Sequence, residues 1–398
     1  MLRFLGLDGS SSDGVGRLIS IGGRQLRLTR QLAEGGHATL FEAKELNSGE
    51  LLVVKQIIAA DGEAAELAER EILSHAALGR HEAVLPLLAE TSERRRDGGG
   101  EYLLLLPLCN GGHLWDYASS TPMRPLTKLR ALEQIAGALD FMHERCLAHM
   151  DVKLENVLVS STRSGGAADS FFLCDFGSTL ESPEGEPAGV LPSALDRRGR
   201  YHLEEWVNAH TTPMYRAPEL CDLHSGLRVG PAADVWALGC LLYTLCFGAH
   251  PFAEASPVQI ISGKWRVPQG AFVDDAFIAL IRAMLRVDPA TRPAAAAIVQ
   301  VARKLQRRGG AGARLAPLSD DDIAQIVTLL KAPGAKAHIQ RQEAPHHTLN
   351  NGFNGTTALR SKCMELHKQT STIASLHLRD VSREPASEYL SRRREGPA

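Results

Sequence analysis

The sequence predicts an α+β protein in which a small antiparallel β lobe precedes a larger helical lobe. Strand-like segments separated by turn residues dominate from residue 26 to about residue 60, and helical periodicity dominates after residue 112. The composition fits a globular chain, because 44% hydrophobic and 23% charged residues lie close to ordinary usage. A length of 398 residues allows two or three domains.

Charge and cysteine content argue against several classes of protein. A formal net charge of −2 gives no electrostatic case for a nucleic-acid partner. The seven cysteines are scattered without metal-type spacing, so we expect a cytoplasmic, reducing environment. The longest apolar stretch, residues 237–249, is shorter than the roughly 20 residues that a membrane span needs, so we expect a buried helix and no integral membrane segment. Leu2 excludes the myristoylation signal, which requires glycine there.

The β lobe is expected to begin at Leu26, after a flexible segment of residues 1–25 with one short strand-like piece at 18–21. From Leu26 the segments LRLTRQL, TLFEAKE and LLVVKQI alternate or run apolar over strand lengths. Residues 63–78 combine helical periodicity with strong helix formers, and residues 102–106 return to an apolar strand. One helix is therefore expected within the β lobe.

The second lobe is expected to contain four main helices, at residues 126–144, 232–247, 275–286 and 294–305. Two polar insertions, residues 92–100 and 160–170, are expected to be surface loops between strands.

The composition changes after residue 306, where we place the end of a domain that spans residues 26–306. Residues 307–398 carry 14 Lys/Arg against 9 Asp/Glu and are expected to be a mostly disordered basic tail. Residues 319–331 are the exception, because Ser319 can cap a helix there. Its apolar stripe consists of Ile323, Ile326, Val327 and Leu330. The stripe fits docking on the domain or binding of a separate partner.

A glycine-containing turn lies between the first two strands from Leu26, where backbone N–H groups could approach phosphates. Its candidate nucleotide-binding residues are Leu32, Ala33, Glu34, Gly35, Gly36, His37, Ala38 and Leu40. Of the glycines in the phosphate-loop pattern G-x-G-x-x-G-x-V, only Gly35 is present. An ordinary hairpin turn is the alternative.

Lys55 ends an apolar run on the third of these strands, and an ammonium buried there would need an anionic partner. Glu71, in the helix that follows, is the candidate. The alternative is a surface lysine and a solvated glutamate, the usual fate of these residue types.

Five short motifs follow one another along the chain. They are HMDVKLEN at residues 149–156, DFG at 175–177, APE at 217–219, DVWALG at 234–239 and DPATRP at 288–293. Their order resembles that found in protein kinases. Each motif is common alone, and a loop carboxylate that caps a turn is the alternative for each Asp. Their order predicts the kinase fold.

Phosphoryl transfer needs a positioned hydroxyl and neutralised phosphate charge more than covalent help. Asp151 is the candidate that accepts or orients the hydroxyl proton, and Lys153 the candidate that stabilises the transferring group. Asn156 and Asp175 offer the hard oxygen ligands that suit Mg²⁺.

Residues 26–305 resemble the eukaryotic protein kinase superfamily, and three local features resemble its Numb-associated kinase family. These are EGGHA at 34–38, Ser178 after DFG, and TTPMYRAPE at 211–219. The resemblance implies a bilobal protein kinase fold, ATP and Mg²⁺ as cofactors, and a protein substrate phosphorylated on serine or threonine. It also implies trafficking-related partners.

The resemblance also implies roles for individual residues. Leu106 would be the gatekeeper, and the backbone of Pro107 and Cys109 would hold adenine. Val53 stands where the family has an adenine-contacting alanine, and Lys55 would pair with Glu71 and reach the phosphates.

Outside the nucleotide pocket, the resemblance implies that Glu219 pairs with Arg292 as a fold clamp and that Asp234 anchors the catalytic loop. Lys153 and Thr212 are the serine/threonine-type choices.

The segment between DFG and APE is long and contains a helix-like run, residues 201–210, with Trp206 as the expected anchor. Met150 replaces the arginine of H-R-D, which removes the usual pocket for an activation-loop phosphate, so regulation by that phosphate is not expected.

Two hypotheses about function follow from these residues. An active kinase is favoured by the intact phosphate- and metal-contacting side chains, whereas Met150, Val53 and the basic tail fit a pseudokinase scaffold.

Overall fold

The computed structural model describes residues 3–4, 14–35, 38–161, 168–183, 188–253, 256–309, 315 and 319–331. All of them belong to the first of two compact units, Met1–Ile339. Gly36, His37 and the predicted tail beyond residue 331 lie outside the described residues.

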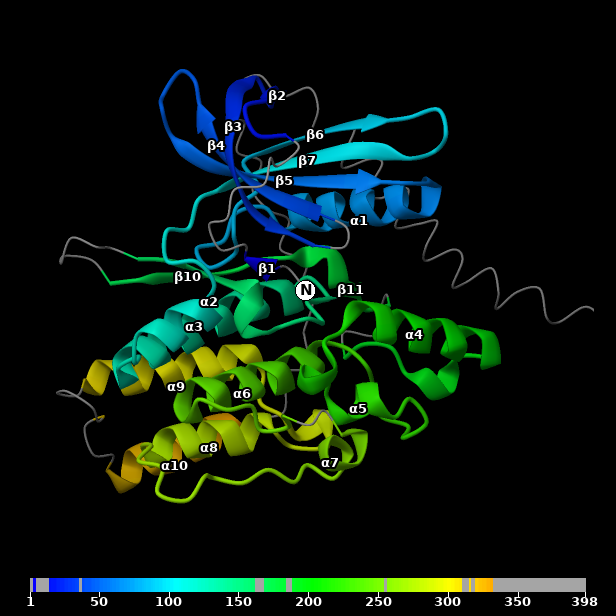
Figure 1. Ribbon diagram of the computed structural model, residues 1–398. Helices are drawn as coiled ribbons and strands as arrows, with labels where there is room; N and C mark the ends of the chain where they lie inside the picture. Colours follow the sequence, from blue (N-terminus) through cyan, green and yellow to red (C-terminus); the bar gives the residue numbers. More distant parts are fainter. Residues whose placement is uncertain are drawn as a thin grey trace, which may run out of the picture. The chain divides into compact units, whose positions relative to one another are not determined.

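The β lobe is an antiparallel sheet, drawn above the helical lobe in Figure 1. Its order is β1 (Arg3–Phe4), β3 (Arg24–Glu34), β4 (Ala38–Glu45), β5 (Leu51–Ala59), β7 (Gly100–Pro107) and β6 (Ala89–Arg94), with β2 (Leu18–Ile21) paired to β3. The expected β lobe is confirmed. The strand-like piece at 18–21 is β2, which adds Ile19 and Ile21 to the sheet core. The insertion at 92–100 is likewise partly strand, since β6 runs to Arg94.

One helix, α1 (Gly62–Leu78), packs on β5 and β7. Its apolar face, Ala65, Ala68 and Ile72, meets Ile57 and Tyr102 of the sheet. Asp61 caps the helix by accepting a hydrogen bond from the Ala64 amide at 2.9 Å. The sheet thereby fixes the helix that carries Glu71.

The helical lobe confirms the bilobal α+β architecture. Its helices are α2 (Leu114–Ser120), α3 (Pro125–His143), α4 (Arg197–His210), α5 (Pro218–Cys221), α6 (Pro231–Phe247), α7 (Pro257–Ile261), α8 (Asp275–Met284), α9 (Ala295–Arg308) and α10 (Asp320–Lys331). Every residue of α6 from Ala233 to Leu245 is buried, which explains its continuous apolar sequence. Within the described part of the chain, no helix combines the length and apolar character needed to cross a membrane.

Two short antiparallel strand pairs flank the loops that carry the HMDVKLEN and DFG motifs. In one, β8 (Leu147–Ala148) pairs with β11 (Leu180–Glu181); in the other, β9 (Val157–Ser160) pairs with β10 (Ser170–Leu173). The HMDVKLEN loop therefore leaves β8 and enters β9, and DFG lies between β10 and β11.

A fully buried ion pair ties the end of the activation segment to the helical lobe. Arg292 donates to both carboxylate oxygens of Glu219, each at 2.7 Å, and both side chains are 0% exposed. The guanidinium also donates to the carbonyl oxygens of Ala232, Arg286 and Val287.

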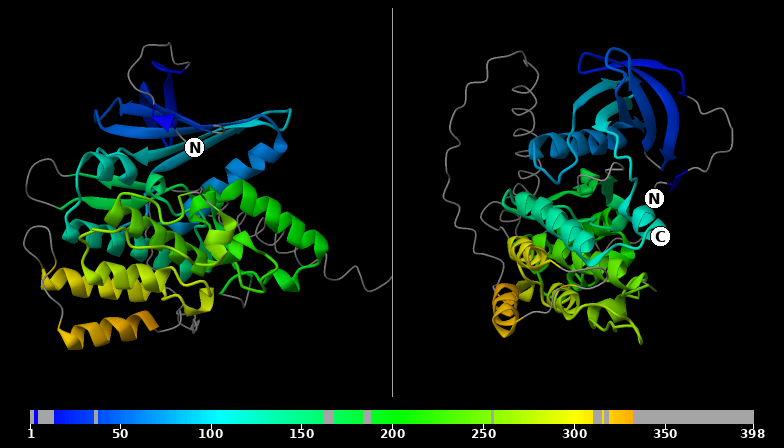
Figure 2. Two further views of the ribbon diagram at one scale, coloured as in Figure 1. Left: turned by 60° about the horizontal axis from the view of Figure 1, so that its bottom comes forward. Right: turned by 90° about the vertical axis from the view of Figure 1, so that its left-hand side faces the viewer.

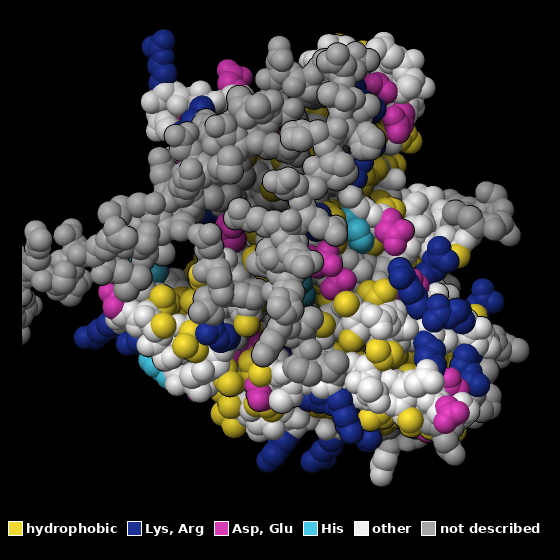
Figure 3. Space-filling view, turned by 180° about the vertical axis from the view of Figure 1, so that it is seen from behind, with side chains coloured by type: hydrophobic (Ala, Val, Ile, Leu, Met, Phe, Trp, Pro, Cys, Tyr) yellow, Lys and Arg dark blue, Asp and Glu magenta, His cyan; other side chains and the backbone are white. Residues whose placement is uncertain are grey.

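The helix α10 lies beside α9 in both views of Figure 2. Ile326 and Leu330 are buried against the lobe, whereas Ile323 and Val327 remain exposed, so half of the predicted stripe is used for docking. Asp322 forms an ion pair with Lys304 of α9 at 3.1 Å. Seen from behind, Lys and Arg side chains over the lower lobe are interspersed with acidic and hydrophobic ones (Figure 3).

Candidate active site

The catalytic loop is anchored from below by Asp234 of α6. Its two carboxylate oxygens accept the backbone N–H groups of His149 and Met150, each at 2.8 Å, and His143 approaches Asp234 at 2.9 Å. Met150 adopts a positive φ of 68°, and its side chain is buried in the core. Asp151, the next residue, therefore extends from a stretch of backbone that Asp234 holds in place.

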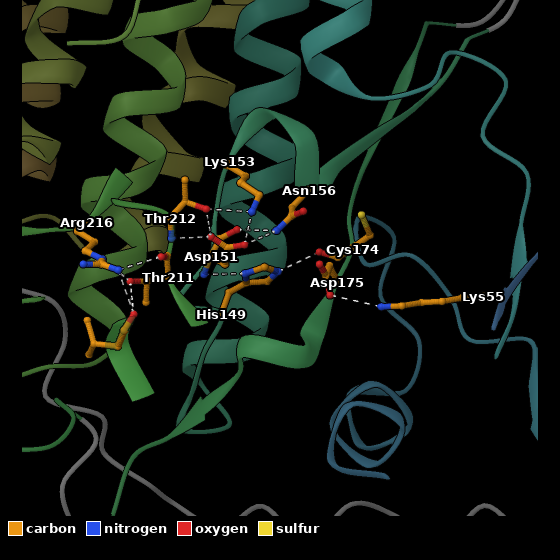
Figure 4. A network of polar contacts seen from close by, with 11 residues as sticks. Lys55, His149, Asp151, Lys153, Asn156, Cys174, Asp175, Thr211, Thr212 and Arg216 are labelled. Carbon is orange, nitrogen blue, oxygen red and sulfur yellow. Dashed lines mark hydrogen bonds and ion pairs between the residues drawn. The ribbon is translucent and has the colours of Figure 1, made fainter. Parts of the chain in front are cut away.

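The Asp151 carboxylate accepts hydrogen bonds from three residues (Figure 4). One carboxylate oxygen accepts from the hydroxyl and amide of Thr212, at 2.7 and 3.2 Å. The other accepts from Asn156 Nδ2 at 3.1 Å and contacts the Lys153 ammonium. Lys153 also donates to the Thr212 hydroxyl at 3.0 Å. The structure thus brings the predicted Asp151, Lys153 and Asn156 together.

A second charged cluster joins the lobes. Lys55 of β5 forms an ion pair with Glu71 of α1, and its Nζ lies 3.6 Å from Asp175 Oδ1. The Lys55 and Glu71 side chains are each only 13% exposed, so the alternative of two solvated surface residues is wrong. Asp175 is 40% exposed and adopts a positive φ of 66°.

The two carboxylates of this cluster stabilise the charge of Lys55, whereas burial raises the pKa of Glu71. Burial alone would lower the pKa of Lys55, but Glu71 and Asp175 outweigh it and raise that pKa above its ordinary value. Lys55 in turn lowers the pKa of Asp175. The cluster therefore presents an ammonium and an ionised carboxylate at neutral pH.

Three rings connect α1 to the catalytic loop. Phe176 lies between His75 and His149, with ring centroids 4.7 and 5.5 Å apart. His75 donates from Nε2 to the Leu85 carbonyl at 2.6 Å, so its neutral tautomer suffices. Sequence reasoning missed His75, although it follows Glu71 by four residues and so shares a helix face with it.

His75 makes stability depend on pH. Burial lowers its pKa to about 4, whereas the unfolded chain titrates near 6.5. As the pH falls from 6.5 to 4 the unfolded state takes up a proton that the folded state refuses, so the free energy of unfolding falls, by about 3 kcal/mol at pH 4. Urea unfolding at pH 7, 5.5 and 4.5 should show a shallower loss for His75→Leu. An identical pH dependence in both proteins would contradict this assignment.

An apolar cluster of side chains includes residues on both sides of the glycine-containing turn. Its buried residues are Val53, Leu85 and Leu106, and its partly buried residues include Leu32, Leu40, Leu108, Cys109, Leu158, Phe172 and Cys174. Apolar walls of this kind fit a flat purine ring. Five predicted nucleotide-binding residues are thereby brought together: Leu32, Leu40, Val53, Leu106 and Cys109.

Ala33, Glu34 and Gly35 of the turn lie outside this apolar cluster. Ala33 is fully buried in β3, the Glu34 carboxylate accepts from Gln31 at 3.0 Å, and the Gly35 amide donates to Ala38 at 2.8 Å. Pro107 ends β7.

Five of the cluster residues named above were missed, namely Leu85, Leu108, Leu158, Phe172 and Cys174. Leu158 and Phe172 are direct cross-strand partners in β9 and β10, and strand register cannot be obtained from one sequence. Burial raises the pKa of Cys109 to about 11 and raises that of Cys174 further.

The activation segment contains the predicted extra helix, α4, which starts four residues earlier than expected. Asp196 caps it by accepting from the Gly199 amide at 2.7 Å. Leu203 and Val207 are its buried anchors. Trp206, the expected anchor, is only partly buried and stacks on His210 at 4.8 Å, so that expectation is corrected.

The chain is similar in sequence to known protein kinases. The family model described as protein kinase domain matches residues 26–302. A probable serine/threonine-protein kinase of Dictyostelium discoideum is 29% identical over 287 residues, covering 70% of this chain and 24% of that protein. The serine/threonine-protein kinase AKL1 of Saccharomyces cerevisiae is 29% identical over 299 residues, covering 70% and 26%. Actin-regulating kinase 1 of the same yeast is 26% identical over 291 residues, covering 70% and 43%. The chain thus spans less than half the length of these relatives.

Proposed function

This chain belongs to the protein kinase family, and from that premise we propose that it transfers the γ-phosphoryl group of Mg-ATP to serine and threonine hydroxyls of proteins. The observation that carries the proposal is Asp151, held among Lys153, Asn156 and Thr212 across from the Lys55–Asp175 ion pair. Curated relatives that are named serine/threonine kinases support the same reaction.

The oxygens present fit Mg²⁺. Asn156 donates from Nδ2 to the Asp151 backbone oxygen and carboxylate, which leaves its Oδ1 as an acceptor for a cation. Asp175 adds a partly exposed, ionised carboxylate. No group of three His, Cys, Asp or Glu suited to a metal occurs among the described residues. Two protein ligands suffice for Mg²⁺, which commonly takes the rest from phosphates and water. When bound, Mg²⁺ neutralises phosphate charge.

The chain's own groups divide the remaining work. Lys55 binds the α- and β-phosphates from a position fixed by Glu71. Asp151 orients the substrate hydroxyl and accepts its proton as the new O–P bond forms. Lys153 places positive charge beside the transferring group, and its bond to Thr212 sets the serine/threonine type of substrate site.

We further propose that this kinase does not depend on an activation-loop phosphate. Many kinases have an arginine before the catalytic aspartate that can bind such a phosphate. Here that position is Met150, whose apolar side chain lies in the core and cannot bind a phosphate. The activation segment instead packs through Leu203 and Val207 of α4.

We also propose a branch of the kinase family and a cellular location for this chain. The turn at 34–38, Ser178 and residues 211–219 support the Numb-associated branch, near its myristoylated and palmitoylated serine/threonine kinase. We place the protein in the cytoplasm, where the described cysteines remain free thiols, and at membranes only through trafficking-related protein partners.

Transfer of ³²P from γ-labelled Mg-ATP tests the proposal, with autophosphorylation and a generic basic protein as acceptors. Incorporation on serine and threonine, lost on removal of divalent metal, is the expected result. A folded chain that binds nucleotide but incorporates no phosphate would instead be a scaffold, the alternative suggested by Met150 and Val53.

A further inference from the structure

Arg216 closes the carboxyl-terminal end of α4. Its NH2 donates to the backbone oxygens of Val207, Asn208 and Thr211, at 3.4, 3.4 and 3.3 Å. Its Nε donates to the Thr211 hydroxyl at 2.7 Å, and its NH1 to Asn208 Oδ1 at 3.1 Å. All three nitrogens of the guanidinium are thus directed at the last turn of one helix.

That helix end carries negative partial charge. The last carbonyl groups of a helix lack partners within it and favour a cation. A guanidinium supplies several donors in a fixed plane and can satisfy more than one carbonyl. No phosphate is needed to hold such a cation in place.

The same contacts lead directly to the catalytic groups. Thr211, which receives Arg216, precedes Thr212, whose amide and hydroxyl both donate to Asp151 (Figure 4). Arg216 itself precedes the buried APE segment. Both ends of the short loop at residues 211–216 are therefore tied together by one side chain.

We propose that Arg216 is a positioning residue that fixes the substrate-binding loop by capping α4, with the helix carbonyls acting where other kinases use a phosphate. The inference rests on the proposed kinase function and adds to it a residue that holds the substrate-binding loop without phosphorylation. In kinases controlled by phosphorylation, the phosphate lies in the activation loop and the cation that binds it lies outside that loop. Here the cation, Arg216, lies in the loop, and the negative partial charge is that of the α4 carboxyl-terminal end.

The surroundings allow a direct test. Arg216, Val207 and Asn208 line a surface cavity of about 300 Å³ between α4 and α5. Small molecules can therefore reach the position that the guanidinium leaves when Arg216 is truncated. Arg198, an exposed arginine of the same helix that donates to His202 at 3.3 Å, provides a matched control.

Arg216→Ala should lower kcat/KM for a peptide substrate by about 100-fold, since displaced reacting groups cost this much. The KM for ATP should stay within about twofold, because Lys55 and Asp175 are untouched. Guanidinium at low millimolar concentration should restore much of the lost rate, whereas methylammonium should not. Arg216→Lys should be intermediate and Arg198→Ala unchanged. Phosphatase treatment should leave the unmodified enzyme active.

Hydrogen exchange gives a readout that does not require turnover. Amides of residues 207–212 should exchange faster in Arg216→Ala and slow again with guanidinium, while α6 stays protected. Full peptide activity in Arg216→Ala, loss of rate without guanidinium rescue, or inactivation by phosphatase would overturn the inference. An unmodified chain without any transfer would reject the proposed function, and unchanged exchange in Arg216→Ala would reject the inference separately.

Discussion

Replacing Asp151 by asparagine should reduce kcat by about 10² to 10⁴, the usual contribution of a positioned acid or base. The substitution keeps the shape of the side chain, but it removes the proton acceptor. It also turns one end into a donor facing Thr212, Asn156 or Lys153, which all donate to Asp151. Steady-state phosphate transfer to a peptide measures the effect.

Nucleotide binding separates this loss from a loss of fold. Lys55 and Asp175 are unchanged in Asp151→Asn, so thermal stabilisation by a non-hydrolysable ATP analogue should persist. Asp116→Asn, at an exposed position in the first turn of α2, is the matched control and should retain full activity. Equal kcat for Asp151→Asn and the unmodified enzyme would remove Asp151 from the chemistry.

The second large effect concerns stability. Glu219→Gln should lower the free energy of unfolding by about 3 to 5 kcal/mol, because it leaves the buried Arg292 charge without its anion. The five N–H groups of that guanidinium are committed to Glu219 and to three backbone carbonyls, so no rearrangement can bring the charge to water. Urea unfolding monitored by tryptophan fluorescence measures the loss, since Arg292 lies 5.2 Å from the Trp236 ring centroid.

An exposed pair provides the comparison. Arg24 and Glu50 are 3.5 Å apart with side chains 39% and 53% exposed. Glu50→Gln should therefore change stability by less than about 1 kcal/mol. Comparable losses in the two variants would show that burial does not control the strength of the Glu219–Arg292 pair.

Much of this fold could be predicted from the sequence, because periodicity reports how each element is buried. The continuous apolar run of α6 and the helix formers of α1 predicted both helices closely. The piece at 18–21 was recognised as strand-like, but its pairing with β3 was not expected. Four residues give too short a pattern to show whether a strand joins a sheet.

The charged site could be predicted because its motifs are local, whereas the composition of the apolar cluster beside the glycine-containing turn depends on tertiary contacts. Asp151, Lys153 and Asn156 lie within six residues of one another, and their contacts follow from one loop. Leu85 lies between α1 and β6 whereas Phe172 lies in β10, and only the folded chain brings them together, with the Leu85 amide donating to the Leu173 carbonyl at 2.9 Å. Arg216 lies within the TTPMYRAPE motif, but its role depends on where α4 ends.

Two thiols of the apolar cluster beside the glycine-containing turn, Cys109 and Cys174, bear on inhibitor chemistry. With a pKa of about 11, only about one Cys109 side chain in ten thousand is a thiolate at pH 7. Cys174 is still less ionised. An electrophilic inhibitor bound beside these thiols would react with them slowly. The selectivity of a covalent inhibitor must therefore come from its reversible binding, before the covalent bond forms.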